Sequence, residues 1–261
     1  MTKKFSLRLT ASMVILLATV VFVKAQSAAG EPQNEVEVRG TFSIPSGEAS
    51  FGSGGSSGST ISFSRDFDFS NEFGFEVRYQ RKSANLKHKF LVDYADTGWE
   101  RSTTLTRSFT FRGETYVANA SLAGTLSLRQ FRAMYAYRWG NEKLRFGPMV
   151  DAGVITTRLK LSGTTNNGAR TGEGSITKFA ATIGYDLDYD PNSKLNLFNN
   201  LGAIIFQGQR LFHVEGGAKY FPVRNFGLSG GYRFQRYKVT DDEDFLTVRS
   251  NGPFFGGIVR F

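Results

Sequence analysis

Apolar and polar side chains alternate along residues 178–189, and this pattern predicts a β-strand with two unlike faces. The even positions are mainly polar or small, whereas the odd positions carry Phe179, Ala181, Ile183, Tyr185, Leu187 and Tyr189. Successive side chains of a strand point to opposite faces, so one face of this strand is apolar and the other is polar. The alternation recurs along most of the chain in segments of about ten residues, the length of a tilted strand that spans a bilayer. The sequence therefore predicts a transmembrane β-barrel.

Ten strands are predicted, and short polar breaks separate them in pairs. The breaks at 82–85, 140–143, 190–193 and 222–225 combine Gly, Pro, Asn or Asp as hairpin turns do, and aromatic residues flank them like an interfacial girdle. The predicted fold class is an all-β, antiparallel up-and-down transmembrane β-barrel of ten strands, with eight strands as the main alternative. The predicted strands are 34–44, 73–81, 87–97, 118–139, 144–161, 175–189, 195–206, 211–221, 226–239 and 252–261.

Three places depart from this simple pattern. Residues 61–69 also alternate, and we interpret them as a projection of the second strand above the membrane, since a separate span would make the strand number odd. Pro148 has no N–H group for a sheet ladder, which predicts a bulge near the end of the barrel that carries the short turns. Leu126 has the opposite parity to Phe131, which predicts another bulge near residues 129–130.

Longer polar segments at the other end of the strands predict extracellular loops. Residues 46–60 contain a Gly/Ser run and residues 164–174 contain Asn-Asn-Gly, so both are expected to be flexible surface loops. Residues 241–244 are all acidic and could in principle hold a divalent cation. They lack the spacing of a calcium loop, so a solvated charge run is expected, with no metal and no cofactor.

The first 25 residues predict a cleaved signal peptide. Lys3, Lys4 and Arg8 precede an apolar run at 11–23, which is too short for a spanning helix, and Ala25 offers a cleavage site. Residues 26–33 are then a short periplasmic segment and residues 34–261 the barrel. Removal of four basic residues lowers the net charge from +9 to +5, and no basic cluster suggests a nucleic-acid partner. The absence of cysteine leaves the strand ladder to stabilise the exported chain.

The last nine residues also alternate and end in an aromatic residue. With Phe255, Val259 and Phe261 on one face, this segment resembles the final strand of Gram-negative outer-membrane β-barrel proteins, and the whole mature chain resembles small single-chain barrels of the OmpA-like or surface-antigen kind. The resemblance implies that these three residues form the signal for the barrel-assembly machinery. It also implies contact with outer-membrane lipid, termini in the periplasm and long loops outside the cell. A monomer is favoured.

The inward parity of the predicted strands collects charged residues of both signs. Fixed charges in so narrow an interior are costly unless they are paired, so the near balance predicts a salt-bridge network that plugs the barrel. A narrow pore lined by the same residues, which would slightly prefer anions, is the alternative. The predicted lumen charges are Glu76, Arg78, Lys89, Asp93, Arg132, Arg138, Arg145, Asp151, Lys178, Asp186, Asp188, Glu215, Lys219, Arg233 and Arg260.

Catalysis is not expected, although some small outer-membrane barrels are enzymes that act on lipid A or peptides. The chain has two histidines, and His88 lies beside a predicted periplasmic turn. His213 is better placed, inside the barrel near its outer end and opposite Gln235, with Asp241 further out. A catalytic base needs its partners within hydrogen-bond reach, and the sequence places no carboxylate at that distance from His213. An envelope or surface role without catalysis is the prediction.

Overall fold

The computed structural model describes residues 34–70, 72–206, 209–241 and 244–261. The predicted signal peptide and the segment 26–33 lie outside these residues. Within the described part of the chain, no helix is long and apolar enough to cross a membrane.

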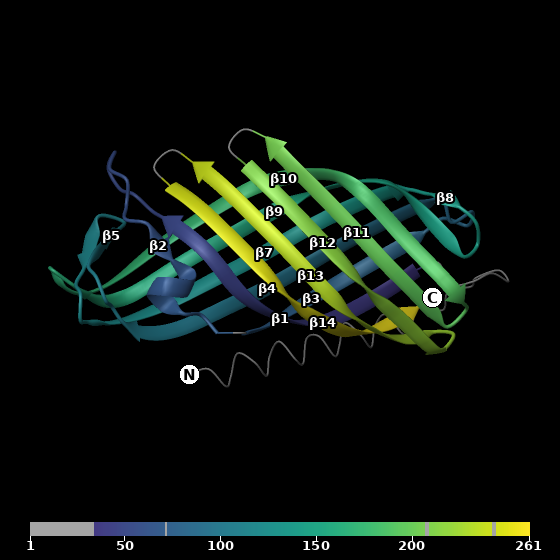
Figure 1. Cartoon of the computed structure of the whole chain (residues 1–261), viewed down its shortest axis with the longest axis horizontal. Coiled ribbons are helices and arrows are strands. Elements are labelled where there is room, and N and C mark those ends of the chain that lie inside the picture. Colours follow the sequence, from purple (N-terminus) through teal and green to yellow (C-terminus); the bar gives the residue numbers. More distant parts are fainter. Residues whose placement is uncertain (1–33, 71, 207–208, 242–243) are drawn as a thin grey trace. The chain divides into compact units, whose positions relative to one another are not determined.

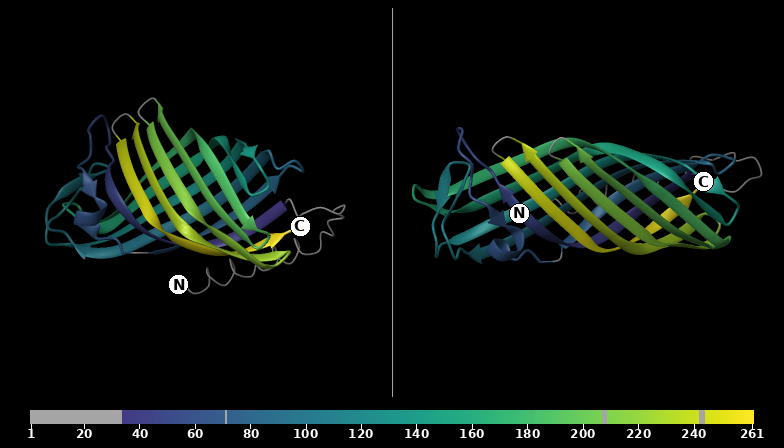
Figure 2. Two further views of the ribbon diagram at one scale, coloured as in Figure 1. Left: turned by 45° about the vertical axis from the view of Figure 1, so that its right-hand side comes forward. Right: turned by 45° about the horizontal axis from the view of Figure 1, so that its top comes forward.

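Ten long antiparallel strands form a closed ring, as Figures 1 and 2 show. Each strand pairs with its neighbour along the chain, and β14 pairs with β1 from Glu35–Arg260 to Ser50–Phe245, which closes the barrel. The predicted ten-stranded barrel is confirmed. The long strands are β1 (Asn34–Ser50), β3 (Glu72–Lys82), β4 (His88–Thr104), β7 (Ser121–Tyr137), β9 (Leu144–Thr165), β10 (Gly168–Asn192), β11 (Leu195–Phe206), β12 (Gln209–Val223), β13 (Phe226–Asp241) and β14 (Asp244–Arg260).

Five short elements complete the described structure. They are β2 (Ile61–Ser62), the π-helical turn η1 (Phe63–Phe67), β5 (Phe109–Phe111), β6 (Glu114–Tyr116) and β8 (Trp139–Gly140). The first four belong to the connections between long strands at one end, called here the long-loop end. The opposite end, where β3–β4, β8–β9, β10–β11 and β12–β13 are joined, is called the short-turn end.

The outer face of the strands is apolar toward the short-turn end. Phe179 and Ile183 are 63% and 70% exposed, as expected of side chains that face lipid. Aromatic residues gather near the short turns, among them Tyr79, Trp139, Phe146, Tyr189, Tyr220 and Phe226. Toward the long-loop end the outer face becomes polar, for example at Arg158 and Glu173, which form an exposed ion pair.

The predicted bulge near residues 129–130 is wrong. Strand β7 pairs without a register shift with β4 and with β9, and its even-numbered residues all face the interior. Leu126 therefore lies inside and Phe131 outside on one regular strand. What changes along the strand is the environment, because the interior is charged in one half and apolar in the other.

The predicted bulge at Pro148 is also absent. Pro148 pairs with Tyr185 in an unbroken ladder between β9 and β10. On its other side the ladder is interrupted, because β7 ends at Tyr137 and β8 begins at Trp139 with the register preserved. A break in one ladder thus accommodates the missing N–H of proline.

The connections at the long-loop end are more ordered than predicted. Residues 61–69 do not project outward as a strand, because β2 pairs with β1 and η1 turns the chain inward. Residues 46–60 are not a free loop: β1 continues to Ser50, Phe51 is buried, and the tip at 53–57 is exposed. Residues 164–174 form the end of the β9–β10 hairpin instead of a loop.

Candidate functional site in the barrel interior

The centre of the interior is an ion-pair network around Glu215. This carboxylate accepts hydrogen bonds from Arg39 at 2.7 Å, from Arg78 at 2.8 Å and from Arg233 at 2.7 Å. These three guanidinium groups come from β1, β3 and β13, so the contacts connect strands that are up to four places apart in the ring. Glu215 itself is 2% exposed.

The remaining members connect the same guanidinium groups to other carboxylates. Arg39 binds Glu37 at 2.6 Å, Arg233 binds Glu76 at 2.6 Å, and Arg78 lies 3.7 Å from Asp93. Eight residues form this central network, four carboxylates and four guanidinium groups: Glu37, Arg39, Glu76, Arg78, Asp93, Arg132, Glu215 and Arg233. Its formal charge is therefore balanced.

A second cluster lies closer to the short-turn end. Lys89 donates to Asp186 at 2.8 Å and to Asp188 at 3.4 Å, while Arg138 binds Asp188 and Lys82 lies 3.3 Å from Asp188. All five side chains are buried or nearly so. Both acids and Arg138 belong to the predicted lumen set.

A third cluster joins the first and last strands of the barrel. The Glu35 carboxylate accepts from Lys219 at 2.6 Å and from Arg260 at 2.8 Å. Lys219 also lies 4.0 Å from Glu37, which connects this cluster to the central network. At the rim, Arg145 binds Asp190.

His213 lies beside the central network. Its Nε2 is 3.2 Å from the Arg132 guanidinium and 3.5 Å from the Asp151 carboxylate, which accepts a hydrogen bond from Thr182 at 2.7 Å. His213 pairs in register with Gln235, but it is 2% exposed and is enclosed by other side chains. The side chain of Asp241 lies outside the described residues.

Five members of these clusters were missed from the sequence: Lys82 and Asp190, which were assigned to short turns, and three residues of β1. Glu35, Glu37 and Arg39 of β1 are 3% exposed or less. The signal was available, because these residues alternate with Val36, Val38 and Gly40 in the same way as the other strands. Their pairing with the last strand could not be predicted, because it depends on how the first and last strands close the barrel.

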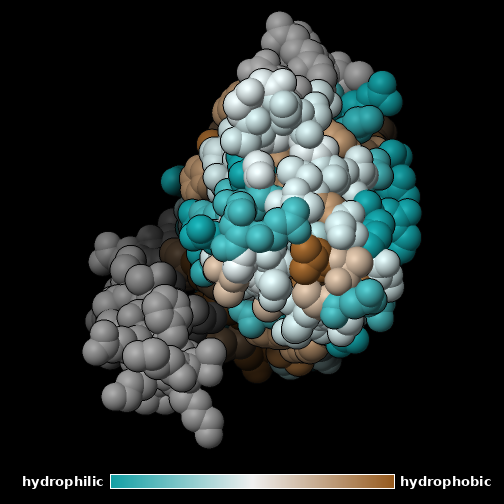
Figure 3. All heavy atoms as spheres, turned by 90° about the vertical axis from the view of Figure 1, so that its left-hand side faces the viewer, coloured by the Kyte–Doolittle hydropathy of each residue, from teal (hydrophilic) through white to brown (hydrophobic). Residues whose placement is uncertain are grey.

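An apolar layer fills the interior above the network, toward the long-loop end. It combines inward side chains of the long strands, such as Leu126, Leu159 and Val239, with Phe63 and Phe67 of η1. The connections at this end contribute most of its aromatic members: Phe51, Phe63, Phe67, Phe69, Phe109, Phe111 and Tyr116. We call these seven residues the aromatic cap. The described side chains over this end form a continuous, mostly hydrophilic or neutral surface in Figure 3.

Two ion pairs anchor the cap. Asp66 of η1 binds Arg107 at 2.9 Å, and Asp244 at the start of β14 binds Arg112 at 3.0 Å. Burial by itself would raise the pKa of the Asp66 carboxyl, but hydrogen bonds from Arg107 and from the Ser62 N–H outweigh it and lower that pKa. Asp244, which was expected to be part of a solvated charge run, is thus a structural partner; its neighbours 242–243 lie outside the described residues.

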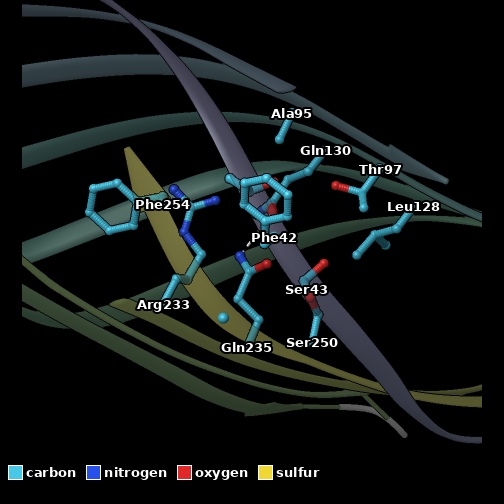
Figure 4. Close-up of a pocket in the computed structure, with 12 residues that line it drawn as sticks. Phe42, Ser43, Ala95, Thr97, Leu128, Gln130, Arg233, Gln235, Ser250 and Phe254 are labelled. Carbon is cyan, nitrogen blue, oxygen red and sulfur yellow. Dashed lines mark hydrogen bonds between the residues drawn. The ribbon is translucent and has the colours of Figure 1, made fainter. Parts of the chain in front are cut away.

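A small cavity lies between the charged network and the apolar layer. Its volume is ≈ 30 Å³, room for about two water molecules. Figure 4 shows Arg233, Gln130 and Gln235 around it, with a hydrogen bond of 3.0 Å between the two glutamines. The lining residues come from both sides of the barrel, so the cavity is an internal space within the packing.

The predicted assembly residues lie at the closure of the barrel. Phe255 is 54% exposed on the outer face and stacks on Phe42 of β1. Val259 pairs with Val36 and with Phe226, and Phe261 follows the end of β14. Lys178 lies on the inward parity of β10 and is half-buried.

No family model and no curated protein matches the sequence. Among solved structures, the outer membrane protease OmpT from Escherichia coli superposes with a TM-score of 0.59 at 10% identity, over 90% of this chain and 99% of that chain. This chain has the fold of an outer-membrane β-barrel. The translocator domain of the autotransporter NalP from Neisseria meningitidis matches with a TM-score of 0.46 at 10% identity over 100% of both chains. Ail, the attachment invasion locus protein of Yersinia pestis, matches with 0.39 at 13% identity over 88% and 99%.

The outer-membrane barrel fold is compatible with different activities. OmpT is a protease, but a likeness at 10% identity concerns the fold alone. The shared architecture therefore does not choose between catalysis and a surface role, and the choice rests on the interior of this chain.

Proposed function

We propose that this protein resides in the outer membrane as a closed, non-catalytic barrel whose role is carried out at the cell surface. The observation that carries the proposal is the continuous filling of the interior. Paired charges occupy the half toward the short-turn end, and the apolar layer with its aromatic cap occupies the other half. With the barrel filled, the parts open to partners are its outer face and its loops.

A narrow pore is the alternative that the sequence left open, and two features weigh against it. The lumen carboxylates and cations bind each other at hydrogen-bond distances, so they offer little free charge to a passing ion. The apolar layer then places side chains such as Leu126 and Leu159, neither of them exposed, across the path. An ion would lose its hydration there without compensation.

Catalysis through His213 is weakly supported. A peptide or lipid substrate would have to reach a side chain that is 2% exposed and lies next to Arg132 and Asp151 within the network. We therefore expect His213→Gln to leave the mass of extracted lipid A and the cleavage of peptides by cells unchanged. A His213-dependent change in either would favour an enzyme instead.

Ion flux into vesicles tests the closed lumen. The purified protein, folded into vesicles that contain a potassium-sensitive dye, is expected to give the same flux as empty vesicles. A variant lacking residues 52–69, which loses three of the seven residues of the aromatic cap, serves as the matched opened control. Flux through the unmodified protein that falls with Arg132→Ala or Arg233→Ala would support the pore.

Surface labelling tests location and orientation. A tag between Gly54 and Gly55 should be reached by an antibody on intact cells, because a side chain added at Gly54 meets no other atom within 4 Å. A tag at Ala84, in the turn between β3 and β4, should be reached only after the outer membrane is opened. The reverse pattern would place the termini outside.

A further inference from the structure

The outer face of β12, β13 and β14 carries four cations close together. Arg210, Arg236, Lys238 and Arg249 share the outward parity of Phe212, Tyr232 and Phe255, which are 37%, 52% and 54% exposed. They follow these apolar residues toward the long-loop end of each strand, at the edge of the lipid-facing band. We call the four residues the basic belt; their strands lie side by side in Figure 1.

The strand register places like charges directly opposite each other. Arg210 pairs with Lys238, and Arg236 pairs with Arg249. Directly opposed side chains in antiparallel strands have Cβ atoms about 5 Å apart, and like charges in this arrangement are destabilising. Two such pairs on adjacent rows concentrate positive charge on one patch.

No acidic side chain of the described residues neutralises the belt. None of its four members forms an ion pair or hydrogen bond in the described parts of the chain, and Glu48 of β1, the acid nearest in register, makes no ion pair either. Two arginines elsewhere on the outer face do have acidic partners: Arg129 binds Asp96 at 3.1 Å and Arg158 lies 3.3 Å from Glu173.

We propose that the basic belt binds the phosphate groups of a phosphorylated lipid in the outer leaflet of the membrane. The patch stands where the apolar band ends, which is the level of lipid headgroups, and arginine binds phosphate through paired N–H donors. The anion would relieve the repulsion within the two like-charge pairs. The inference rests on the proposed residence in the outer membrane.

Binding to lipid A tests the belt directly. Bisphosphorylated lipid A is titrated onto the full protein in neutral detergent, and bound lipid is counted by native mass spectrometry. Each cation near an anionic headgroup is worth about fivefold in affinity, so Arg236→Gln with Arg249→Gln should weaken binding on the order of twentyfold. Arg236→Lys with Arg249→Lys should retain most of it.

Arg158→Gln is the matched control, because it removes an exposed outward arginine that already has an acidic partner. It should bind lipid A like the unmodified protein. Equal affinity of the double glutamine variant and this control would overturn the proposal. So would equal binding of lipid A without its phosphates, or displacement of the lipid by inorganic phosphate at similar concentration, which would indicate a site for a free anion.

Residence in the outer membrane and lipid binding by the basic belt can be refuted independently of each other. Titration in detergent does not depend on where the protein resides, whereas the tag at Gly54 on intact cells tests residence alone. Far-ultraviolet circular dichroism of each variant shows whether the barrel is folded before the titration is interpreted.

Discussion

Replacing Glu215 by glutamine removes the carboxylate that three arginines share. The change keeps the side-chain shape but leaves the central network with three carboxylates and four guanidinium groups, so one buried positive charge has no partner. Breaking a buried ion pair from one side costs about 3–5 kcal/mol. Glu215 is 2% exposed, so water cannot replace the lost contacts. We expect Glu215→Gln to lower the free energy of unfolding by about 3–5 kcal/mol.

Urea unfolding of the protein in lipid vesicles, followed by tryptophan fluorescence, measures this effect. Glu173→Gln is the control, because its ion pair with Arg158 is 45% and 54% exposed and should be worth less than about 1 kcal/mol. Adding Arg233→Gln to Glu215→Gln restores the charge balance and should recover part of the loss. A Glu215→Gln variant as stable as the control would refute the reasoning, since it would mean that water already solvates these guanidinium groups.

Three further predictions concern the apolar half. Phe67→Ala should cost about 3–5 kcal/mol in urea unfolding, because the ring is 1% exposed and stacks on Phe69; a loss below about 1 kcal/mol would contradict a packed cap. Trp99→Phe should cost about 1–3 kcal/mol, since it leaves the Ser43 carbonyl without the indole N–H at 2.9 Å. The lowered pKa of Asp66 means that its anchoring of the cap is complete above the ordinary value of about 3.9 and is lost as the pH falls through the lower, folded value. Once corrected for the intrinsic exchange rate at each pH, the protection of the amides in residues 61–69 should therefore stay constant from pH 7 to about 5 and fall below about 4, and Asp66→Asn should remove that dependence.

Much of the half toward the short-turn end could be predicted from the sequence because two physical signals coincide there. Lipid requires apolar residues such as Phe179 and Ile183 outside, and the confined interior requires polar ones inside, so alternation marks each strand. The short turns after Lys82 and Gly140 carry the residues that tight turns require. Strand number and order follow from these signals.

The same reasoning failed for the half at the long-loop end, because the polarity of the inner and outer faces is reversed there. There the outer face meets water and the interior is apolar, so Leu126 and Phe131 seem out of phase although β7 is regular. Residues 61–69 show the apolar–polar alternation that is typical of a strand. They nevertheless turn inward, because Phe63 and Phe67 pack into an apolar layer formed by distant strands. The alternation within one segment does not show which side chains the strands across the barrel contribute to its surroundings.

The charged interior was predictable as a set of residues but not as a pattern of partners. The inward parity identifies Glu76, Arg78 and Glu215, whereas their convergence on one network depends on the shear of the barrel and on β1, whose Glu35 and Glu37 were overlooked. His213 was placed on the correct face, but the carboxylate beside it, Asp151, lies far away in the sequence.

Single-channel recording in a planar bilayer tests the central claim most directly. The folded full-length protein, inserted at high salt, is predicted to give no conductance steps, because the paired charges and the apolar layer leave no continuous aqueous path. Reproducible steps whose size changes with Arg132→Ala or Arg233→Ala would contradict the closed barrel and show that the same charges line a pore.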